Sequence, residues 1–357
     1  MKPNHDSISS AFSPDYITAR SRFLEAAKSI NCEIYAYPIK TKTDDDLTID
    51  VAIRWGTSQK ALVVSSGLHG AEGFLGSAVQ LSLLKSAINP RTTLILIHAL
   101  NPYGFKYLRR TNEDNIDLNR NFLLEGDLYA GSPPLYAKLN QFFNPASPPP
   151  RFEPYLLKAI AIIARYGIKA MKETLPVGQY DYPQGLFFGG KEPSQTANIL
   201  EENIQNWIGD AQKVIHIDFH TGLGAWGTYK LFAGEVDNPQ KIQSLTAQFG
   251  VDKIETWTPQ GISYPIRGGL GKWCKTKFPQ CDYDFLTAEF GTYPTLKVVK
   301  ALRAENRAFW YSPSTNTNLK DWFKEIFAPS DRTWRDVCVT QGLEIIQMAN
   351  QALSIYS

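Results

Sequence analysis

Short apolar runs that alternate with helical patterns are the feature that most constrains the fold of this chain. Four runs, each short enough for one strand, are residues 61–67 (ALVVSSG), 92–100 (TTLILIHAL), 213–220 (KVIHIDFH) and 284–291 (DFLTAEFG). Between the first two runs, residues 74–88 place apolar side chains at helical spacing. Strands that are apolar on both faces are typical of a sheet that helices cover on both sides. The sequence therefore predicts an α/β fold.

The remaining patterns extend this prediction along the chain. Residues 13–30 have the spacing of an opening helix, with Ser13 as its N-cap. Further elements are expected at residues 33–39, 47–55 and 228–234 (strands) and 195–208, 295–310 and 336–353 (helices). Residues 144–194 differ, because they are rich in proline and glycine around a helical segment at 159–171. We expect residues 1–357 to form one domain, with 144–194 as an excursion from it.

Composition argues against several classes of protein. The 357 residues carry a net charge of +2. This is not the strong positive charge that is typical of proteins that bind nucleic acid or an anionic membrane. No apolar stretch follows the first lysine, and the longest apolar segment, residues 156–171, is too short and too charged to span a bilayer. We therefore expect a cytoplasmic protein. Its four cysteines are expected to be free thiols, with a Cys274–Cys281 disulfide as the alternative.

Histidine and carboxylate side chains stand where three of the predicted strands end. The residues are His69 and Glu72 after the first run, His220 at the end of the third and Glu289 near the end of the fourth. Ligands of open α/β sheets bind beyond the carboxyl ends of the strands. Two histidines and a carboxylate suit zinc, with a fourth position open for water. The sequence thus suggests one zinc ion held by His69, Glu72 and His220, and Glu289 is left as a candidate general base.

Two more polar residues share a face of the third predicted strand with His220. By alternation, His216 and Asp218 point to the same side as His220. Only His220 lies at the exit of the strand, so we assign His216 to the core. Asp218 has two interpretations: it orients a ligating imidazole from behind the metal, or it is a buried, hydrogen-bonded carboxylate without a catalytic role.

Residues 101–122 form a second dense polar segment, directly after the run at 92–100. It contains Arg109, Arg110, Asn119 and Arg120. Arginine binds carboxylates through two parallel hydrogen bonds and stabilises oxyanions. A charge-rich loop is usually only solvated, but a loop that follows a buried strand of the same sheet is well placed to bind an anionic substrate group.

The order of these motifs resembles the carboxypeptidase A-like zinc metallocarboxypeptidases, a superfamily that also includes aspartoacylase and succinylglutamate desuccinylase. The motifs are HxxE at 69–72, R-T-N-x(6)-N-R at 110–120, DFHTGLG at 218–224 and AEFGT at 288–292. Segments such as HALNPYGF (98–105) and GQYDYPQGLFFGGKEPS (178–194) resemble a bacterial branch known mostly as a domain of unknown function. The resemblance covers residues 12–293. It implies a three-layer α/β/α fold around a mixed, mostly parallel sheet of about eight strands.

The resemblance also implies roles for the candidate residues at the metal. His69, Glu72 and His220 match the ligands of one Zn²⁺ ion. Glu289 matches the glutamate that activates water and then passes its proton to the leaving amine.

Other candidates match groups that contact the substrate. Arg110 matches the arginine that polarises the scissile carbonyl, with its neighbour Arg109 as the alternative. Asn119 and Arg120 match the pair that grips the terminal carboxylate of a substrate. Tyr264 is the nearest candidate for a tyrosine on a mobile loop near the substrate.

Together these patterns favour a zinc-dependent amidohydrolase, foremost a carboxypeptidase-like metallopeptidase that acts on a small peptide with a free carboxylate. The DFHTGLG motif is closer to the deacylase pattern, so a deacylase of N-acyl amino acids is the first alternative. A protein that binds a metal or a carboxylate without catalysis is the second, and the presence of both Glu289 and Arg110 disfavours it. No G-x-S-x-G motif supports a serine hydrolase.

Overall fold

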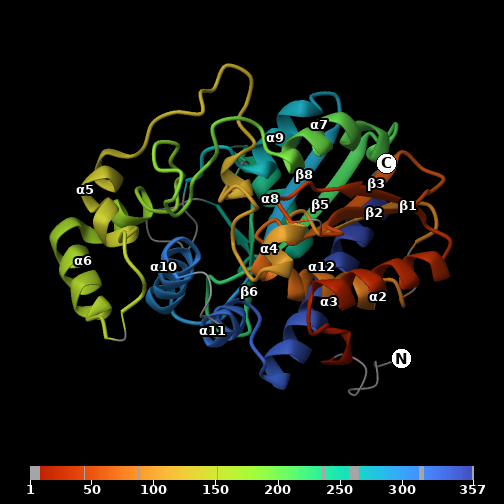
Figure 1. Cartoon of the computed structure of the whole chain (residues 1–357). Coiled ribbons are helices and arrows are strands. Elements are labelled where there is room, and N and C mark those ends of the chain that lie inside the picture. The colour runs from red at the N-terminus through yellow and green to blue at the C-terminus, as the bar shows by residue number, and fades with distance from the viewer. Residues whose placement is uncertain are drawn as a thin grey trace.

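One eight-stranded sheet runs through the protein, as the computed structural model in Figure 1 shows. The structure describes residues 9–43, 45–86, 89–150, 152–234, 236, 238–256, 265–312 and 317–355. The strands are β1 (Glu33–Pro38), β2 (Thr48–Arg54), β3 (Lys60–Ser66), β4 (Thr93–His98), β5 (Lys213–Thr221), β6 (Tyr229–Phe232), β7 (Ile254–Glu255) and β8 (Asp282–Phe290). Their order across the sheet is β1-β2-β4-β3-β5-β8-β6-β7. The predicted fold class is confirmed.

The centre of the sheet is parallel, and this decides where polar side chains meet. Strands β4, β3, β5 and β8 run in the same direction, whereas β1, β2 and β6 join the sheet as antiparallel strands. In register, Ser66 of β3 is the partner of Phe219, and His220 is the partner of Glu289. The carboxyl ends of three central strands therefore lie at one edge, as the sequence predicts for its candidate site.

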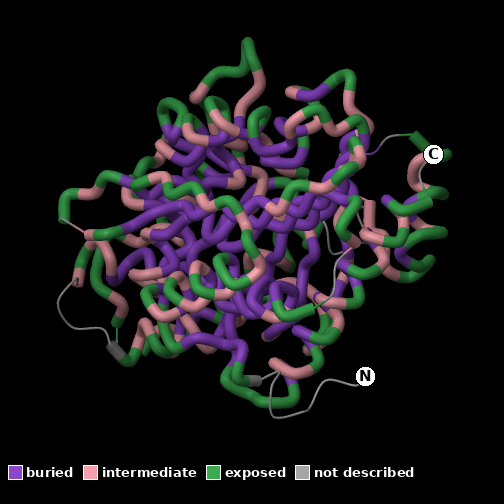
Figure 2. The backbone as a smooth tube through the Cα atoms, turned by 90° about the vertical axis from the view of Figure 1, so that its right-hand side faces the viewer, coloured by how far each residue is buried: buried purple, intermediate pink, exposed green. Residues whose placement is uncertain are grey.

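Helices cover both faces of the sheet. They are α2 (Tyr16–Ser29), α3 (Gly73–Leu83), α4 (Pro102–Lys106), α5 (Pro134–Phe143), α6 (Tyr155–Lys172), α7 (Gln195–Ile208), α8 (Pro239–Phe249), α9 (Leu270–Lys277), α10 (Thr295–Tyr311), α11 (Thr317–Phe327) and α12 (Arg332–Ile355), with short 3-10 turns η1 (Ser9–Ala11), η2 (Gly70–Glu72) and η3 (Leu118–Arg120). Figure 1 shows α2, α3 and α12 on one side of the sheet and α7 and α9 on the other. The buried residues concentrate in the sheet and in the helices packed on it (Figure 2).

The opening helix has a different N-cap from the one predicted. It begins at Tyr16, and Asp15 is the cap, because its side chain accepts a hydrogen bond from the backbone N–H of Thr18. Ser13 lies too far from the first turn and instead accepts a hydrogen bond from Arg22 at 3.1 Å.

The predicted excursion at 144–194 contains α6 and follows α5 directly. Figure 1 shows α5, α6 and α10 beside one another at the end of the molecule away from β1. Side chains of α5, α10 and α11 form a second hydrophobic cluster, separate from the main core. The excursion therefore adds α6 to the helices at this end of the molecule.

Two further expectations can be compared with the structure. All four cysteines are free thiols, so the alternative disulfide does not form. Among the described residues, no helix has the length and apolar character needed to cross a membrane.

Candidate metal centre

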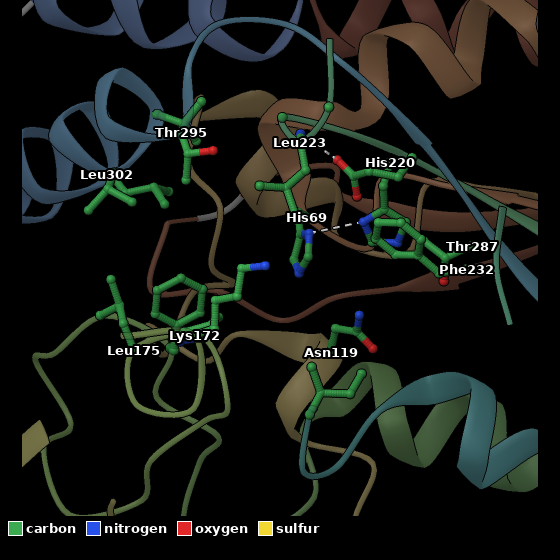
Figure 3. A pocket seen from close by; sticks show the side chains of 18 of the residues that line it. His69, Asn119, Lys172, Leu175, His220, Leu223, Phe232, Thr287, Thr295 and Leu302 are labelled. Carbon is green, nitrogen blue, oxygen red and sulfur yellow. Dashed lines mark hydrogen bonds between the residues drawn. The ribbon is translucent and has the colours of Figure 1, made fainter. Parts of the chain in front are cut away.

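Two histidines and one glutamate converge at the carboxyl edge of the sheet. The Nδ1 atoms of His69 and His220 lie 3.1 Å apart, and Glu72 places one carboxylate oxygen 3.0 Å from His69 Nδ1 and the other 3.1 Å from His220 Nδ1. One donor atom from each residue fits within 4.8 Å of the other two. All three side chains are buried, and Figure 3 shows the two imidazoles facing each other. The structure thus brings together the three residues proposed as ligands.

The backbone between β3 and α3 turns sharply to aim His69 and Glu72 at one point. Gly67 has a φ of 66°, which is unfavourable for residues with a Cβ. Gly70 lies so close to α4 that a Cβ would stand 2.0 Å from the carbonyl carbon of Gly104. The N–H of Thr221 donates to Glu72 at 3.1 Å and ties this turn to the end of β5.

Each histidine has a carboxylate near its other ring nitrogen. Nε2 of His220 lies 2.6 Å from Asp218, which also accepts a hydrogen bond from Ser65. Nε2 of His69 lies 3.1 Å from Asp117 and 2.8 Å from Nη2 of Arg110. A carboxylate that accepts the Nε2 proton leaves the Nδ1 lone pair for a cation, an arrangement typical of metal-ligating histidines. The geometry therefore agrees with the interpretation in which Asp218 orients the imidazole of His220.

Sequence reasoning did not single out Asp117. It lies within the R-T-N-x(6)-N-R motif at 110–120, is fully buried and caps η3 by accepting from the N–H of Asn119. It also accepts from Arg110 Nε at 2.9 Å. The spacing of arginines on both sides of this aspartate is a signal that could have marked it as a buried anion.

The electrostatics of the cluster suit a divalent cation. Burial would raise the pKa of Glu72, but His69 and His220 outweigh it and hold the pKa below its ordinary value. Burial, followed by the like charge of Glu72, raises the pKa of Glu289 to about 8. A cation among these carboxylates would offset that repulsion. Two imidazole nitrogens with one carboxylate are a donor set that zinc accepts, so the residues present fit the implied ion.

The two neighbouring arginines have separate environments. Arg110 borders the cluster, where it donates to Glu72 at 3.1 Å and to Asp117 at 2.9 Å. Arg109 points away and donates to Glu305 at 2.9 Å, with its guanidinium carbon 3.4 Å from the ring centre of Phe309. Of the two, only Arg110 lines the cavity beside the metal cluster.

The predicted carboxylate-binding pair is divided in the structure. Asn119 lines the cavity and accepts from the N–H of Leu270 at 3.1 Å. Arg120 is fully buried, does not line the cavity, and donates to the carbonyl of Pro176 at 2.7 Å. The segments around Gly178 and Gly268 pack against it. Tyr264 lies outside the described residues.

A cavity of about 970 Å³ opens beside the cluster. Glu289 lines it and accepts from the N–H of Leu223 at 2.9 Å. In Figure 3, Lys172, Leu175 and Leu302 lie on one side of His69, and Phe232 and Thr287 lie on the other. The sequence did not indicate that Lys172 faces this cavity.

Comparison with known proteins agrees with this fold. The family model described as "Protein of unknown function (DUF2817)" matches residues 12–341. The chain belongs to the DUF2817 family. No curated protein matches it significantly.

The fold of this DUF2817 protein is similar to that of a solved carboxypeptidase. It is similar to carboxypeptidase A from Helicoverpa armigera, with a TM-score of 0.52 and 12% identity over 96% of this chain and 74% of the other. Bovine thrombin-activatable fibrinolysis inhibitor gives a TM-score of 0.45 and 10% identity over 94% and 98% of the chains. An aspartoacylase family protein from Mesorhizobium loti gives 0.40 and 13% over 78% and 66%. The predicted branch, a domain of unknown function, is confirmed by the family model, and the insect enzyme supports the carboxypeptidase-like fold.

Proposed function

We propose that this DUF2817 protein is a zinc-dependent amidohydrolase that cleaves an amide in a substrate with a free carboxylate, as a carboxypeptidase-like metallopeptidase does. One observation carries the proposal. A buried His69–Glu72–His220 cluster borders a large cavity that a fourth group, the Glu289 carboxylate, also lines. A site that only stored a metal would have no need for this further acid or base.

His69, Glu72 and His220 would hold the ion. Zinc in a site of this kind lowers the pKa of a water ligand toward neutrality and draws electrons from a carbonyl oxygen. Asp218 keeps the imidazole of His220 in the orientation that presents Nδ1, and Asp117 and Arg110 together hold the imidazole of His69.

Glu289 is the proposed general base. The N–H of Leu223 holds one of its carboxylate oxygens, which fixes the group at the edge of the cavity. It takes a proton from the attacking water and passes it to the nitrogen of the leaving amine. A base whose pKa lies near the working pH does both steps efficiently.

Arg110 is the proposed donor to the oxyanion. Its hydrogen bond to Asp117 fixes the plane of the guanidinium, and the group lines the cavity. Such a preorganised donor stabilises negative charge that develops on the carbonyl oxygen during the attack. Of the predicted carboxylate-binding pair, Asn119 lines the cavity and Arg120 does not. Asn119 therefore remains a candidate for binding the substrate carboxylate.

A substrate panel with measured metal content tests the proposal. Zinc-loaded protein should release an amino acid from C-terminal dipeptides or N-acyl amino acids, and amidation of the substrate carboxylate should abolish the release. His220→Ala should retain far less zinc by elemental analysis, because it removes one ligand. Unchanged zinc content in that variant, or no hydrolysis of any substrate on the panel, would contradict the proposal.

N-acyl amino acid deacylation is the second candidate. The observation that favours it is the apolar character of the cavity on the side of α6 and α10, where a peptide chain would find few partners for its amide groups.

A further inference from the structure

Part of the cavity lies between α5, α6 and α10, away from the sheet. We call this part the acyl arm and define it by Phe143, Ala159, Ile163, Leu175, Val298 and Leu302, all of which line the cavity. Four of these residues, Phe143, Leu175, Val298 and Leu302, also belong to the second hydrophobic cluster. The arm is therefore an apolar part of the cavity, and the second hydrophobic cluster forms much of its wall.

Apolar space of this kind favours an apolar ligand. Protein interiors normally pack as densely as organic crystals, and an unfilled apolar cavity loses contacts on its walls. Water gains little there, because a buried water needs two or more polar partners. A hydrocarbon group that enters the arm regains those contacts and removes apolar surface from water.

The walls of the arm disfavour a peptide as the occupant. They are formed largely by three helices, α5, α6 and α10, whose backbone groups are mostly bonded within the helices. A peptide bond placed there would lose its hydrogen bonds to water without replacement, which costs free energy. An alkyl or alkenyl chain has no such requirement.

Lys172 stands at the inner end of the arm. Figure 3 shows its side chain extending beside Leu175 with the ammonium directed toward His69. A lysine of this kind places its methylene stem along apolar surface and its charge in a polar region. The apolar surface of the arm thus ends where the metal centre begins, so the cavity is shaped for an amphiphile.

We infer that the acyl arm binds a long hydrocarbon acyl group, so that the substrate is an N-acyl amino acid whose amide lies at the metal centre. The reaction rests on the proposed function, whereas binding of the chain does not. In the reaction, the oxygen of water bonds to the acyl carbon, the C–N bond breaks and a proton moves to nitrogen. The products are a long-chain carboxylic acid and a free amino acid.

A chain-length series tests the inference on the zinc-loaded enzyme. N-Acetyl-, N-butanoyl-, N-octanoyl- and N-dodecanoylglycine are compared below their micelle concentrations. Each methylene that enters the arm should raise kcat/KM by up to about fourfold. The dodecanoyl compound should therefore exceed the acetyl compound by at least about a hundredfold. Equal kcat/KM values along the series would overturn the inference.

Two substitutions on α6 show whether the chain uses the arm. Ala159→Phe fills the arm, since Ala159 is buried and lines the cavity. It should lower the dodecanoyl-to-acetyl ratio at least about tenfold. Ala164→Phe makes the same change on the exposed side of the same helix and should leave the ratio unaltered. Equal ratios in wild type and Ala159→Phe, at equal thermal stability, would contradict a chain bound in this arm.

Calorimetry separates this inference from the proposed hydrolase. Zinc-loaded Glu289→Gln protein is titrated with the same acylglycines, so that binding is measured without turnover. Affinity that rises with chain length supports the arm even if no amide is hydrolysed, and in that case only the proposed function fails. Affinity that is independent of chain length, or no binding of the dodecanoyl compound, overturns the arm whether or not the enzyme is active. If Ala159→Phe does not fold, the wild-type series still decides.

Discussion

The metal centre and the acyl arm meet in one cavity but are built in opposite ways. The proposed ligand His220 stands on β5, whose nine residues are all buried, and each charged group of the cluster contacts at least one other polar group. The arm has α6 as its outer wall, and only Tyr155 and Ala159 of that helix are buried. The contrast teaches that the proposed chemistry is fixed on the rigid sheet edge, while the preference for a chain resides in helices added beside it.

The largest expected effect belongs to Glu289 at the metal centre. Glu289→Gln should retain zinc and lower kcat by roughly 10³- to 10⁴-fold, because the amide cannot take a proton from water. Steady-state kinetics and elemental analysis check both statements. Turnover equal to wild type would show that Glu289 is not the base.

Arg110 and Arg109 give a sharper test, because they are adjacent in sequence and serve different regions. Arg110→Met should lower kcat by roughly 10²- to 10³-fold, the range found when one oxyanion donor is removed. Arg109→Met should leave Glu305 with one buried cationic partner fewer and lower the free energy of unfolding by about 3 kcal/mol. Kinetics and urea unfolding measure the two effects, and an exchange of the two phenotypes would reverse the assignment.

Asp218 tests whether a carboxylate behind the ligand matters to the metal. Asp218→Asn keeps the size of the side chain but removes the charge next to His220 Nε2. Zinc affinity should fall roughly 10- to 100-fold, as measured by competition with a chelator. Asp210→Asn, a surface carboxylate that contacts Gln59, is the matched control and should leave the affinity unchanged. Equal affinities in the two variants would make Asp218 only a buried structural group.

The same contrast explains what the sequence could predict. Parallel strands bring their carboxyl ends to one edge, so His69, His220 and Glu289 could be grouped from the positions of three apolar runs. The fold class followed from the same runs, and both the DUF2817 branch and the carboxypeptidase-like fold are confirmed. The roles assigned to these residues stay predictions.

The features that the sequence did not predict depend on contacts between distant segments. Asp117 reaches His69 only when the loop after β4 folds back over the edge of the sheet. Arg120 is buried because segments around Gly178 and Gly268, far away along the chain, close over it. The acyl arm exists because α10 packs beside the excursion, and no local pattern in either segment reveals a space between them. Local periodicity predicts the elements, but it does not predict which faces of distant helices enclose a cavity.

The smallest expected effect concerns Lys172, where the two regions join. Lys172→Met keeps a long, flexible apolar side chain but removes the ammonium that points toward His69. The KM for a substrate with a carboxylate should rise about three- to tenfold with kcat nearly unchanged, since an attraction of roughly 1 kcal/mol is lost. Lys169→Met, on the exposed side of α6, should leave KM unchanged. Added salt should weaken binding by the wild type more than binding by Lys172→Met. Salt screens the attraction between the ammonium and the substrate carboxylate, and the variant lacks that ammonium. If Lys172→Met instead binds every acylglycine more tightly, the ammonium opposes the chain, and the head group must be recognised by Asn119 and the metal alone.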